Sequence, residues 1–257
     1  MLVFFGIVLG ILIFILGSMI FSFLNVVIYR LPRGENFIRG RSRCPACGHS
    51  LTFSDMMPII SWVRLRGRCR YCKVRISFRY TVVEALGGAA ALGSVLVFGF
   101  SAHAALTFAM CCVLVCVAFI DYDTMEIPDI FNLIAAGIGV LSIFITDYAV
   151  WYEHLIGLFV ISVPMLIIAL FVPGGFGGGD IKLMGACGLY LGWSNAVLAF
   201  FIGVVIGGVA AIRLILKKKK GRKDMIPFGP PLCVGVAAAM FAGDFLIDYY
   251  IVSILNF

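Results

Sequence analysis

Two acidic residues stand where apolar segments end, and their setting indicates paired-carboxylate chemistry. Asp121 directly follows the apolar residues 118–120, and Asp180 closes the glycine-rich run 174–180. An isolated charge at membrane depth costs about 2.5–3.5 kcal/mol even on lenient scales, so ionisable groups there usually serve a function. Two close carboxyl groups share one proton, which lets the pair activate a water and protonate a departing amine. Asp121 and Asp180 are therefore candidate catalytic residues of an aspartic protease.

The residues before Asp180 indicate that another backbone comes close to this point. Five of the six residues 174–179 are glycine, although each glycine in a helix costs about 1 kcal/mol relative to alanine. Gly177, Gly178 and Gly179 leave room for an extended substrate strand beside Asp180. A flexible hinge between helices is the alternative. A phosphate-binding loop fits less well, because the run ends in an acid that would repel phosphate.

Three further charged residues are candidate supports for substrate binding: Glu84, Asp129 and Lys182. Glu84 lies about one turn inside an expected helix, where it could also pair with an arginine or favour the helix N-terminus. Asp129 ends the acidic segment 121–129, for which a solvated turn is the alternative. Lys182 is one of only two cations outside two basic blocks of the chain.

Four of the nine cysteines form two Cys-x-x-Cys pairs. The pairs are Cys44 with Cys47 and Cys69 with Cys72, and 21 residues separate them. Two such turns can direct four sulfurs at one centre, which is the usual pattern of a structural zinc site. Disulfides are the alternative, but a reducing cytoplasm opposes them. We therefore predict a zinc ion that stabilises a polar loop with little core of its own.

The composition is that of a membrane protein. The chain has 257 residues, of which 62% are hydrophobic and 13% charged, and its mean hydropathy is +1.09. Soluble domains are about 45–50% apolar and about 25% charged, so an ordinary soluble globule, a disordered chain and a coiled coil are excluded. Long apolar runs without alternation predict membrane-spanning helices rather than a barrel.

Eight apolar segments are expected to be helices. They are residues 2–28, 82–100, 104–120, 130–146, 155–172, 181–193, 196–216 and 232–250. Segment 181–193 spans about 20 Å at 1.5 Å per residue, short of a hydrocarbon core of about 30 Å. The positive-inside rule nevertheless favours its crossing, because only then do both basic blocks, residues 30–79 and 217–223, lie in the cytoplasm.

This topology predicts an all-α polytopic membrane protein with about eight transmembrane helices. Residues 1–29 form the first helix, residues 30–80 a small cytoplasmic zinc-binding loop domain, and residues 81–257 a transmembrane aspartic peptidase domain. Both acidic motifs then face the cytoplasm. A nucleic-acid partner is not expected, since neither basic block belongs to a recognisable nucleic-acid-binding fold.

The motifs, in order and spacing, resemble those of the bacterial type IV prepilin peptidases. The matching segments are residues 22–32, 44–49, 58–62, 66–72, 76–80 followed by Glu84, 121–129, 177–180 and 227–230. The resemblance implies that Asp121 and Asp180 are the catalytic aspartates of an enzyme in the bacterial inner membrane, surrounded by lipid. It further implies cleavage of type IV prepilins and type II secretion pseudopilins after a leader glycine.

The same resemblance implies a second activity, methylation of the new amino terminus with S-adenosylmethionine, with which the cysteine-bearing loop is associated. No Rossmann glycine fingerprint supports that cofactor, so methyl transfer rests on the resemblance alone. Two alternatives stay open. One is another Gly-x-Gly-Asp protease, preflagellin- or presenilin-like, although such enzymes lack the four-cysteine loop. The other is an ion-coupled transporter that uses Asp121 and Asp180 as ion ligands.

Overall fold

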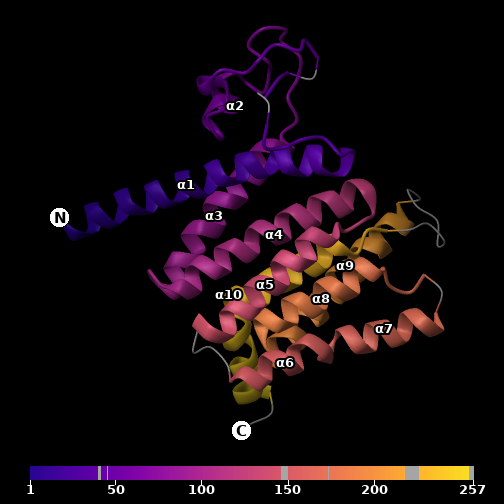
Figure 1. The fold of residues 1–257 in the computed structure, drawn as a ribbon. Coiled ribbons are helices and arrows are strands. Elements are labelled where there is room, and N and C mark those ends of the chain that lie inside the picture. Colours follow the sequence, from indigo (N-terminus) through magenta and orange to yellow (C-terminus); the bar gives the residue numbers. More distant parts are fainter. Residues whose placement is uncertain (40–41, 45, 146–149, 173, 218–225, 255–257) are drawn as a thin grey trace. The chain divides into compact units, whose positions relative to one another are not determined.

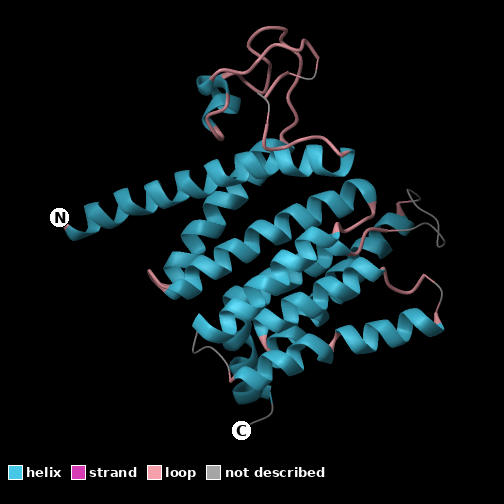
Figure 2. Ribbon diagram, in the orientation of Figure 1, coloured by secondary structure: helices cyan, strands magenta, loops and turns pink. Residues whose placement is uncertain are grey.

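The computed structural model describes residues 1–257 except 40–41, 45, 146–149, 173, 218–225 and 255–257. Within these described ranges the regular elements are helices, accompanied by two isolated β-bridges (Figure 2). The predicted all-α fold is confirmed. Of the basic block 217–223, only Lys217 lies among the described residues.

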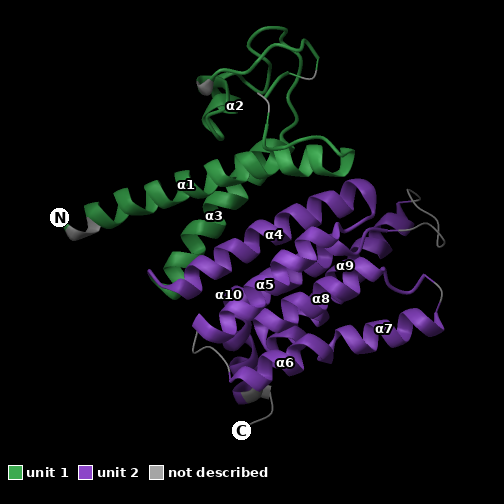
Figure 3. Cartoon of the chain, in the orientation of Figure 1, with its two compact units in different colours: residues 1–99 green, residues 100–257 purple. Residues whose placement is uncertain are grey.

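The chain divides into two compact units, Met1–Gly99 and Phe100–Phe257 (Figure 3). The first unit contains α1 (Leu2–Arg30), the short α2 (Ile60–Arg64) and α3 (Arg79–Phe98), with the 3-10 turns η1 (Leu31–Arg33) and η2 (Phe53–Asp55). Helices α1 and α3 pack closely, because a Cβ on Gly87 of α3 would overlap the ring of Phe21 of α1. Small residues at such crossings are typical of membrane helices.

The second unit is a helical bundle with α8 at its centre (Figure 1). Its helices are α4 (Ala102–Thr124), α5 (Asp129–Ile145), α6 (Trp151–Val160), α7 (Ser162–Phe171), α8 (Gly178–Leu191), α9 (Trp193–Leu216) and α10 (Gly229–Ile254). Helices α5, α6, α7, α9 and α10 all contact α8, and residues 183–191 of α8 are buried throughout. The short segment 181–193 of the sequence is thus the core of this unit.

The predicted apolar segment 155–172 forms two helices rather than one. Helix α6 ends at Val160 and α7 begins at Ser162. The cause is Pro164, which lacks a backbone N–H and whose ring clashes with the carbonyl of the residue four positions earlier, Val160.

Among the described residues, six helical segments are long and apolar enough to cross a membrane, judged by length and composition. They comprise α1, α3, α4, α6 together with α7, α9 and α10. Helix α5, with 17 residues, is a shorter apolar helix, and α8 has only 14 residues. The predicted eight crossings, and the sidedness that depends on them, stay predictions.

Candidate active site and metal site

Asp121 lies in the last turn of α4 and is held by the start of α10. Its side chain is buried, with 5% of the residue exposed. Its Oδ2 accepts a hydrogen bond of 2.9 Å from the backbone N–H of Gly229, the first residue of α10. A helix N-terminus presents free N–H groups and a partial positive charge, so it is a favourable partner for a carboxylate.

Asp180 lies in the first turn of α8 and is also buried, with 8% of the residue exposed. Among the described residues, no group makes a hydrogen bond to its Oδ1. The carboxyl groups of Asp180 and Asp121 are close enough for their charges to interact. Both carboxyl groups are also within electrostatic range of the buried thiol of Cys233 in α10. The second unit therefore brings the two predicted catalytic residues together beside the first turns of α10.

The glycine motif and the turn between α4 and α5 pack against each other. A Cβ on Gly179 would lie 2.9 Å from Cβ of Ile127, and one on Gly177 would lie 3.1 Å from Oδ2 of Asp180. A Cβ on Gly178, by contrast, would meet no described atom within 4 Å. Two of the three glycines are therefore needed for close packing, and Gly178 faces open space next to Asp180.

Asp129 and Lys182, two of the predicted supports, form an ion pair. Nζ of Lys182 lies 2.8 Å from Oδ1 of Asp129, and both side chains are exposed. The pair joins the first residue of α5 to the first turns of α8. An exposed ion pair contributes at most about 1 kcal/mol, so this contact adds only modestly to the packing of the two helix starts.

The third predicted support, Glu84, lies in the first unit. Its Oε1 accepts a hydrogen bond of 2.8 Å from Ser22 Oγ of α1, and its Oε2 accepts one of 2.8 Å from the backbone N–H of Ile59. Glu84 itself belongs to α3. Its carboxylate thus connects α1, α3 and the start of α2, which is a structural contribution that the sequence did not reveal.

Gly229 and Cys233 lie beside the carboxyl groups but were not among the predicted site residues, although Gly229 belongs to the matching segment 227–230. Gly229 precedes Pro230 and Pro231 at the start of an apolar run. Proline is common in the first turn of a helix, and a helix start is where backbone N–H groups remain free to bind an anion. That local signal could have identified the N-terminus of α10 as a carboxylate partner.

Gly229→Ala is expected to reduce peptide-bond cleavage by the predicted aspartic pair by about 10- to 100-fold, since misplacing a reacting group by about 1 Å can cost about 100-fold. The new Cβ would lie 2.7 Å from Oδ2 and 3.1 Å from Cβ of Asp121, so the carboxylate must move from its hydrogen bond. The measurement is the initial cleavage rate. Gly208→Ala in α9 is the matched control, because its Cβ would meet nothing within 4 Å. Equal rates for the two variants would contradict the role of Gly229.

The four predicted metal-binding cysteines come together in the first unit. The sulfurs of Cys44, Cys47, Cys69 and Cys72 all lie within 4.8 Å of one another, and all four are free thiols. The Sγ atoms of Cys44 and Cys72 are 3.8 Å apart, whereas a disulfide requires about 2.05 Å. Four sulfurs at about 2.3 Å from a tetrahedral zinc are about 3.8 Å apart, so the donor set fits zinc.

The two cysteine turns have the same backbone design. The N–H of Cys44 donates to the carbonyl of His49, and the N–H of Cys69 donates to that of Val74, both at 2.9 Å. An isolated β-bridge closes each turn. The residue after the second cysteine is left-handed in both, Gly48 with φ 69° and Lys73 with φ 61°. We refer to residues 43–50 and 68–75 as the first and second knuckle.

His49 is not part of the sulfur cluster. Its ring contacts that of Tyr71 in the second knuckle in a tilted arrangement, with 3.5 Å between the ring centroids and 35° between the ring planes. The contact ties the two knuckles together independently of a metal ion. The predicted ligand set contains the four cysteines and not His49, which agrees with this position.

Backbone N–H groups favour the thiolate form, which binds metal, at two of the four cysteines. The N–H groups of Cys47 and Ala46 stabilise the Cys44 thiolate and lower the pKa of that thiol to about 7. The N–H of Val74 favours the Cys72 thiolate, but desolvation and the three neighbouring thiols outweigh it and raise the pKa of Cys72 to about 11. Four thiolates therefore do not form together without a cation that compensates their charge.

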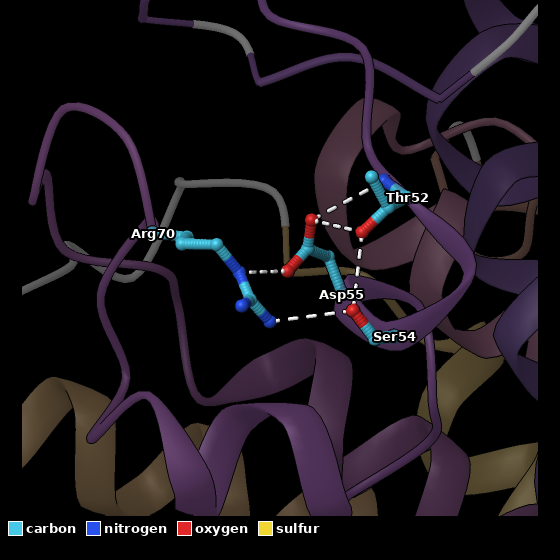
Figure 4. A network of polar contacts seen from close by, with 4 residues as sticks. All are labelled: Thr52, Ser54, Asp55 and Arg70. Carbon is cyan, nitrogen blue, oxygen red and sulfur yellow. Dashed lines mark hydrogen bonds and ion pairs between the residues drawn. The ribbon is translucent and has the colours of Figure 1, made fainter.

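A polar network connects the second knuckle to η2 (Figure 4). Nε of Arg70 lies 2.6 Å from Oδ1 of Asp55, and its guanidinium also donates to Ser54 Oγ at 3.3 Å. The other oxygen of Asp55 accepts hydrogen bonds from the N–H and Oγ1 of Thr52, at 3.2 and 2.7 Å. Desolvation opposes ionisation of Asp55, but the bonds from Thr52 and Arg70 hold its pKa below the usual value. These contacts stabilise the loop in addition to the sulfur cluster.

The fold and these sites define a polytopic α-helical membrane protein with a buried carboxylate pair and a four-thiol metal site. The chain belongs to the type IV leader peptidase family. Residues 108–212 match the model of that family, and residues 15–98 match the bacterial peptidase A24 N-terminal domain. The predicted resemblance is confirmed.

Three curated relatives illustrate the similarity, and each is named prepilin leader peptidase/N-methyltransferase. The protein of Burkholderia pseudomallei (strain 1026b) is 32% identical over 259 residues, which cover 89% of this chain and 84% of the relative. That of Aeromonas salmonicida (strain A449) is 34% identical over 279 residues, covering 95% and 94%. That of Bacillus subtilis (strain 168) is 30% identical over 240 residues, covering 93% and 97%. No solved structure matches the chain.

Proposed function

We propose that this protein is a membrane-embedded aspartic endopeptidase that removes the leader peptide from type IV prepilins and pseudopilins. It also N-methylates the new amino terminus with S-adenosylmethionine. The observation that carries the proposal is the buried pair of Asp121 and Asp180, in a chain whose relatives are named for these two activities. Asp121 and Asp180 are the catalytic residues.

The carboxyl pair holds one proton and acts as a unit. The ionised member takes a proton from a water, whose oxygen attacks the carbonyl carbon of the scissile peptide bond. The protonated member donates its proton to the departing amine nitrogen as the C–N bond breaks. The products are a leader carboxylate and a free amino terminus. The Gly229 N–H keeps Oδ2 of Asp121 in position throughout.

The glycine motif leaves room for the backbone of the substrate. Gly178 borders open space beside Asp180, which suits an extended strand running past the carboxyl pair. The ion pair of Asp129 and Lys182 stabilises the helix starts that form this place. A prepilin has a hydrophobic helix in the bilayer and its cleavage point at the membrane surface, so a site at the helix ends can reach the scissile bond.

The sidedness, the domain boundaries, the metal and the methyl transfer are part of the same proposal. The active site faces the cytoplasm, in the bacterial inner membrane. Residues 1–29 serve as the first membrane helix, residues 30–80 as a zinc-binding loop domain and residues 81–257 as the peptidase domain. Zinc, held by Cys44, Cys47, Cys69 and Cys72, stabilises the loop. S-adenosylmethionine, when bound, would supply the methyl group for the new amine and leave S-adenosylhomocysteine and a proton, an activity that the relatives' names support.

The test uses the purified full-length protein in liposomes with a prepilin and labelled S-adenosylmethionine. We expect intact mass to show loss of the leader and gain of one methyl group. A prepilin in which a bulky residue replaces the glycine at the leader's end is the control and should remain uncut. Cleavage without methylation would retain the peptidase and refute the methyltransferase. Failure to cut any of several prepilins would contradict the proposal and favour ion transport, which proton or metal flux would then reveal.

A further inference from the structure

A cavity of about 460 Å³ lies against the second knuckle, and Cys69 of the sulfur cluster forms part of its wall. It is lined by Leu65, Arg66, Arg68, Cys69 and Lys73. Three of the five lining residues are cationic, and these three are exposed to solvent. None of the lining residues is acidic. A concave site with several converging cations is suited to an anion rather than to an apolar ligand.

These cations are not neutralised within the described part of the first unit. The carboxylate of Asp55 is paired with Arg70, and that of Glu84 is bound to Ser22 and Ile59. The third acid of this unit, Glu35, is exposed and does not line the cavity. Residues 30–79 contain twelve Lys and Arg but only two acids. A zinc ion with four thiolates carries a net charge of about −2, which leaves the loop strongly positive. The cavity therefore has a charge that a bound anion would balance.

The backbone places two of these cations, Arg66 with φ 52° and Lys73, in the left-handed region. Lys73 has φ 61°, and the equivalent residue of the first knuckle is Gly48 with φ 69°. Glycine adopts this left-handed region without strain, whereas a residue with a Cβ does not. Strain of this kind is retained where the side chain serves a purpose. The turn itself does not require a lysine at position 73. The presence of this lysine therefore indicates that its charge has a function.

The position of the loop along the chain indicates which anion is at hand. Residues 31–78 connect α1 to α3, and both helices are long and apolar enough to cross a membrane. The loop is tethered at both ends to the membrane surface, where phosphates of anionic lipids are concentrated. Arginine and lysine form strong charge-assisted hydrogen bonds with phosphate oxygens. We infer that the cavity lined by Arg66, Arg68 and Lys73 binds the phosphate of an anionic phospholipid headgroup.

The test measures binding of short-chain phosphatidylglycerol to the purified, zinc-loaded full-length protein in neutral detergent by calorimetry. We expect binding of this lipid and much weaker binding of short-chain phosphatidylcholine. Arg68→Gln/Lys73→Gly should weaken binding by about tenfold or more, the effect of losing charge-assisted contacts. Glycine at position 73 suits the left-handed backbone. Arg39→Gln/Arg64→Gln, which removes the same charge from exposed residues outside the cavity, should change affinity by no more than about twofold.

Several outcomes would overturn the inference. Equal binding of both lipids, or equal weakening by the two double variants, would show attraction to the general charge of the loop. Displacement of the lipid by inorganic phosphate at similar concentration would identify a free-phosphate site, and displacement by S-adenosylmethionine a cofactor site. Zinc content of each variant is measured by elemental analysis. If Arg68→Gln/Lys73→Gly loses zinc, Arg66→Asn replaces it, since asparagine tolerates the left-handed backbone of residue 66, and unchanged affinity would refute the site.

Discussion

Asp121→Asn and Asp180→Asn are each expected to abolish leader-peptide cleavage, with a loss of about 10³-fold or more. An amide can neither take a proton from water nor donate one to the leaving amine, and the remaining carboxyl group cannot do both. Because the two groups act as a unit, the double variant should be no worse than either single variant. The measurement is a time course of leader removal by intact mass.

The asparagine variants should keep their fold, which separates a catalytic loss from a structural one. An amide has nearly the size of a carboxylate, and its oxygen at position 121 can still accept the hydrogen bond from Gly229. Helix content and elution as a monodisperse species check this. Asp123→Asn, an exposed acid two residues away, is the matched control and should cut at close to the wild-type rate. Substantial cleavage by either Asp121→Asn or Asp180→Asn would refute the proposed pair.

Cys44→Ser is expected to release the metal and to disorder the loop. Structural zinc contributes about 10–16 kcal/mol of apparent binding free energy in small zinc domains, and losing one of four thiolates should lower affinity by about 100-fold or more, since even changes beyond the ligands cost 10- to 100-fold. Cys44 is buried, and its thiol has the lowered pKa of the cluster. Its replacement therefore removes a ligand whose thiolate the backbone already stabilises.

Zinc per protein after dialysis against a weak chelator, together with protease sensitivity of residues 30–80, measures this effect. Cys112→Ser is the matched control, because Cys112 lies in α4 and outside the sulfur cluster. It should retain the wild-type zinc content and digestion pattern. An unchanged zinc content in Cys44→Ser would show that the four sulfurs do not hold the metal. Loss of zinc with an unchanged digestion pattern would show that the metal does not stabilise the loop.

The local features of this protein were readable from the sequence because their physical causes are local. Long apolar runs predict helices wherever a backbone must satisfy its own hydrogen bonds, and helices form in all eight expected segments. Each Cys-x-x-Cys turn sets its own two sulfurs, so the spacing alone predicted the four-thiol cluster that the structure contains. Asp121 and Asp180 stood out because each is a charge next to an apolar segment.

Pairings across the chain depend on packing, and the sequence could not specify them. The N–H of Gly229 reaches Asp121 over 108 positions, and Lys182 reaches Asp129 over 53. Glu84 was a candidate site residue by sequence, whereas its partners Ser22 and Ile59 make it a connector of the first unit.

The sequence by itself thus determined the helical segments, the cysteine cluster and the candidate carboxylates, because spacing and hydropathy act over a few residues. Only the tertiary structure decided what holds each carboxylate and that the short segment 181–193 forms the core of its unit. The reason is that buried polar groups and close helix crossings are satisfied by whichever residues the fold brings beside them.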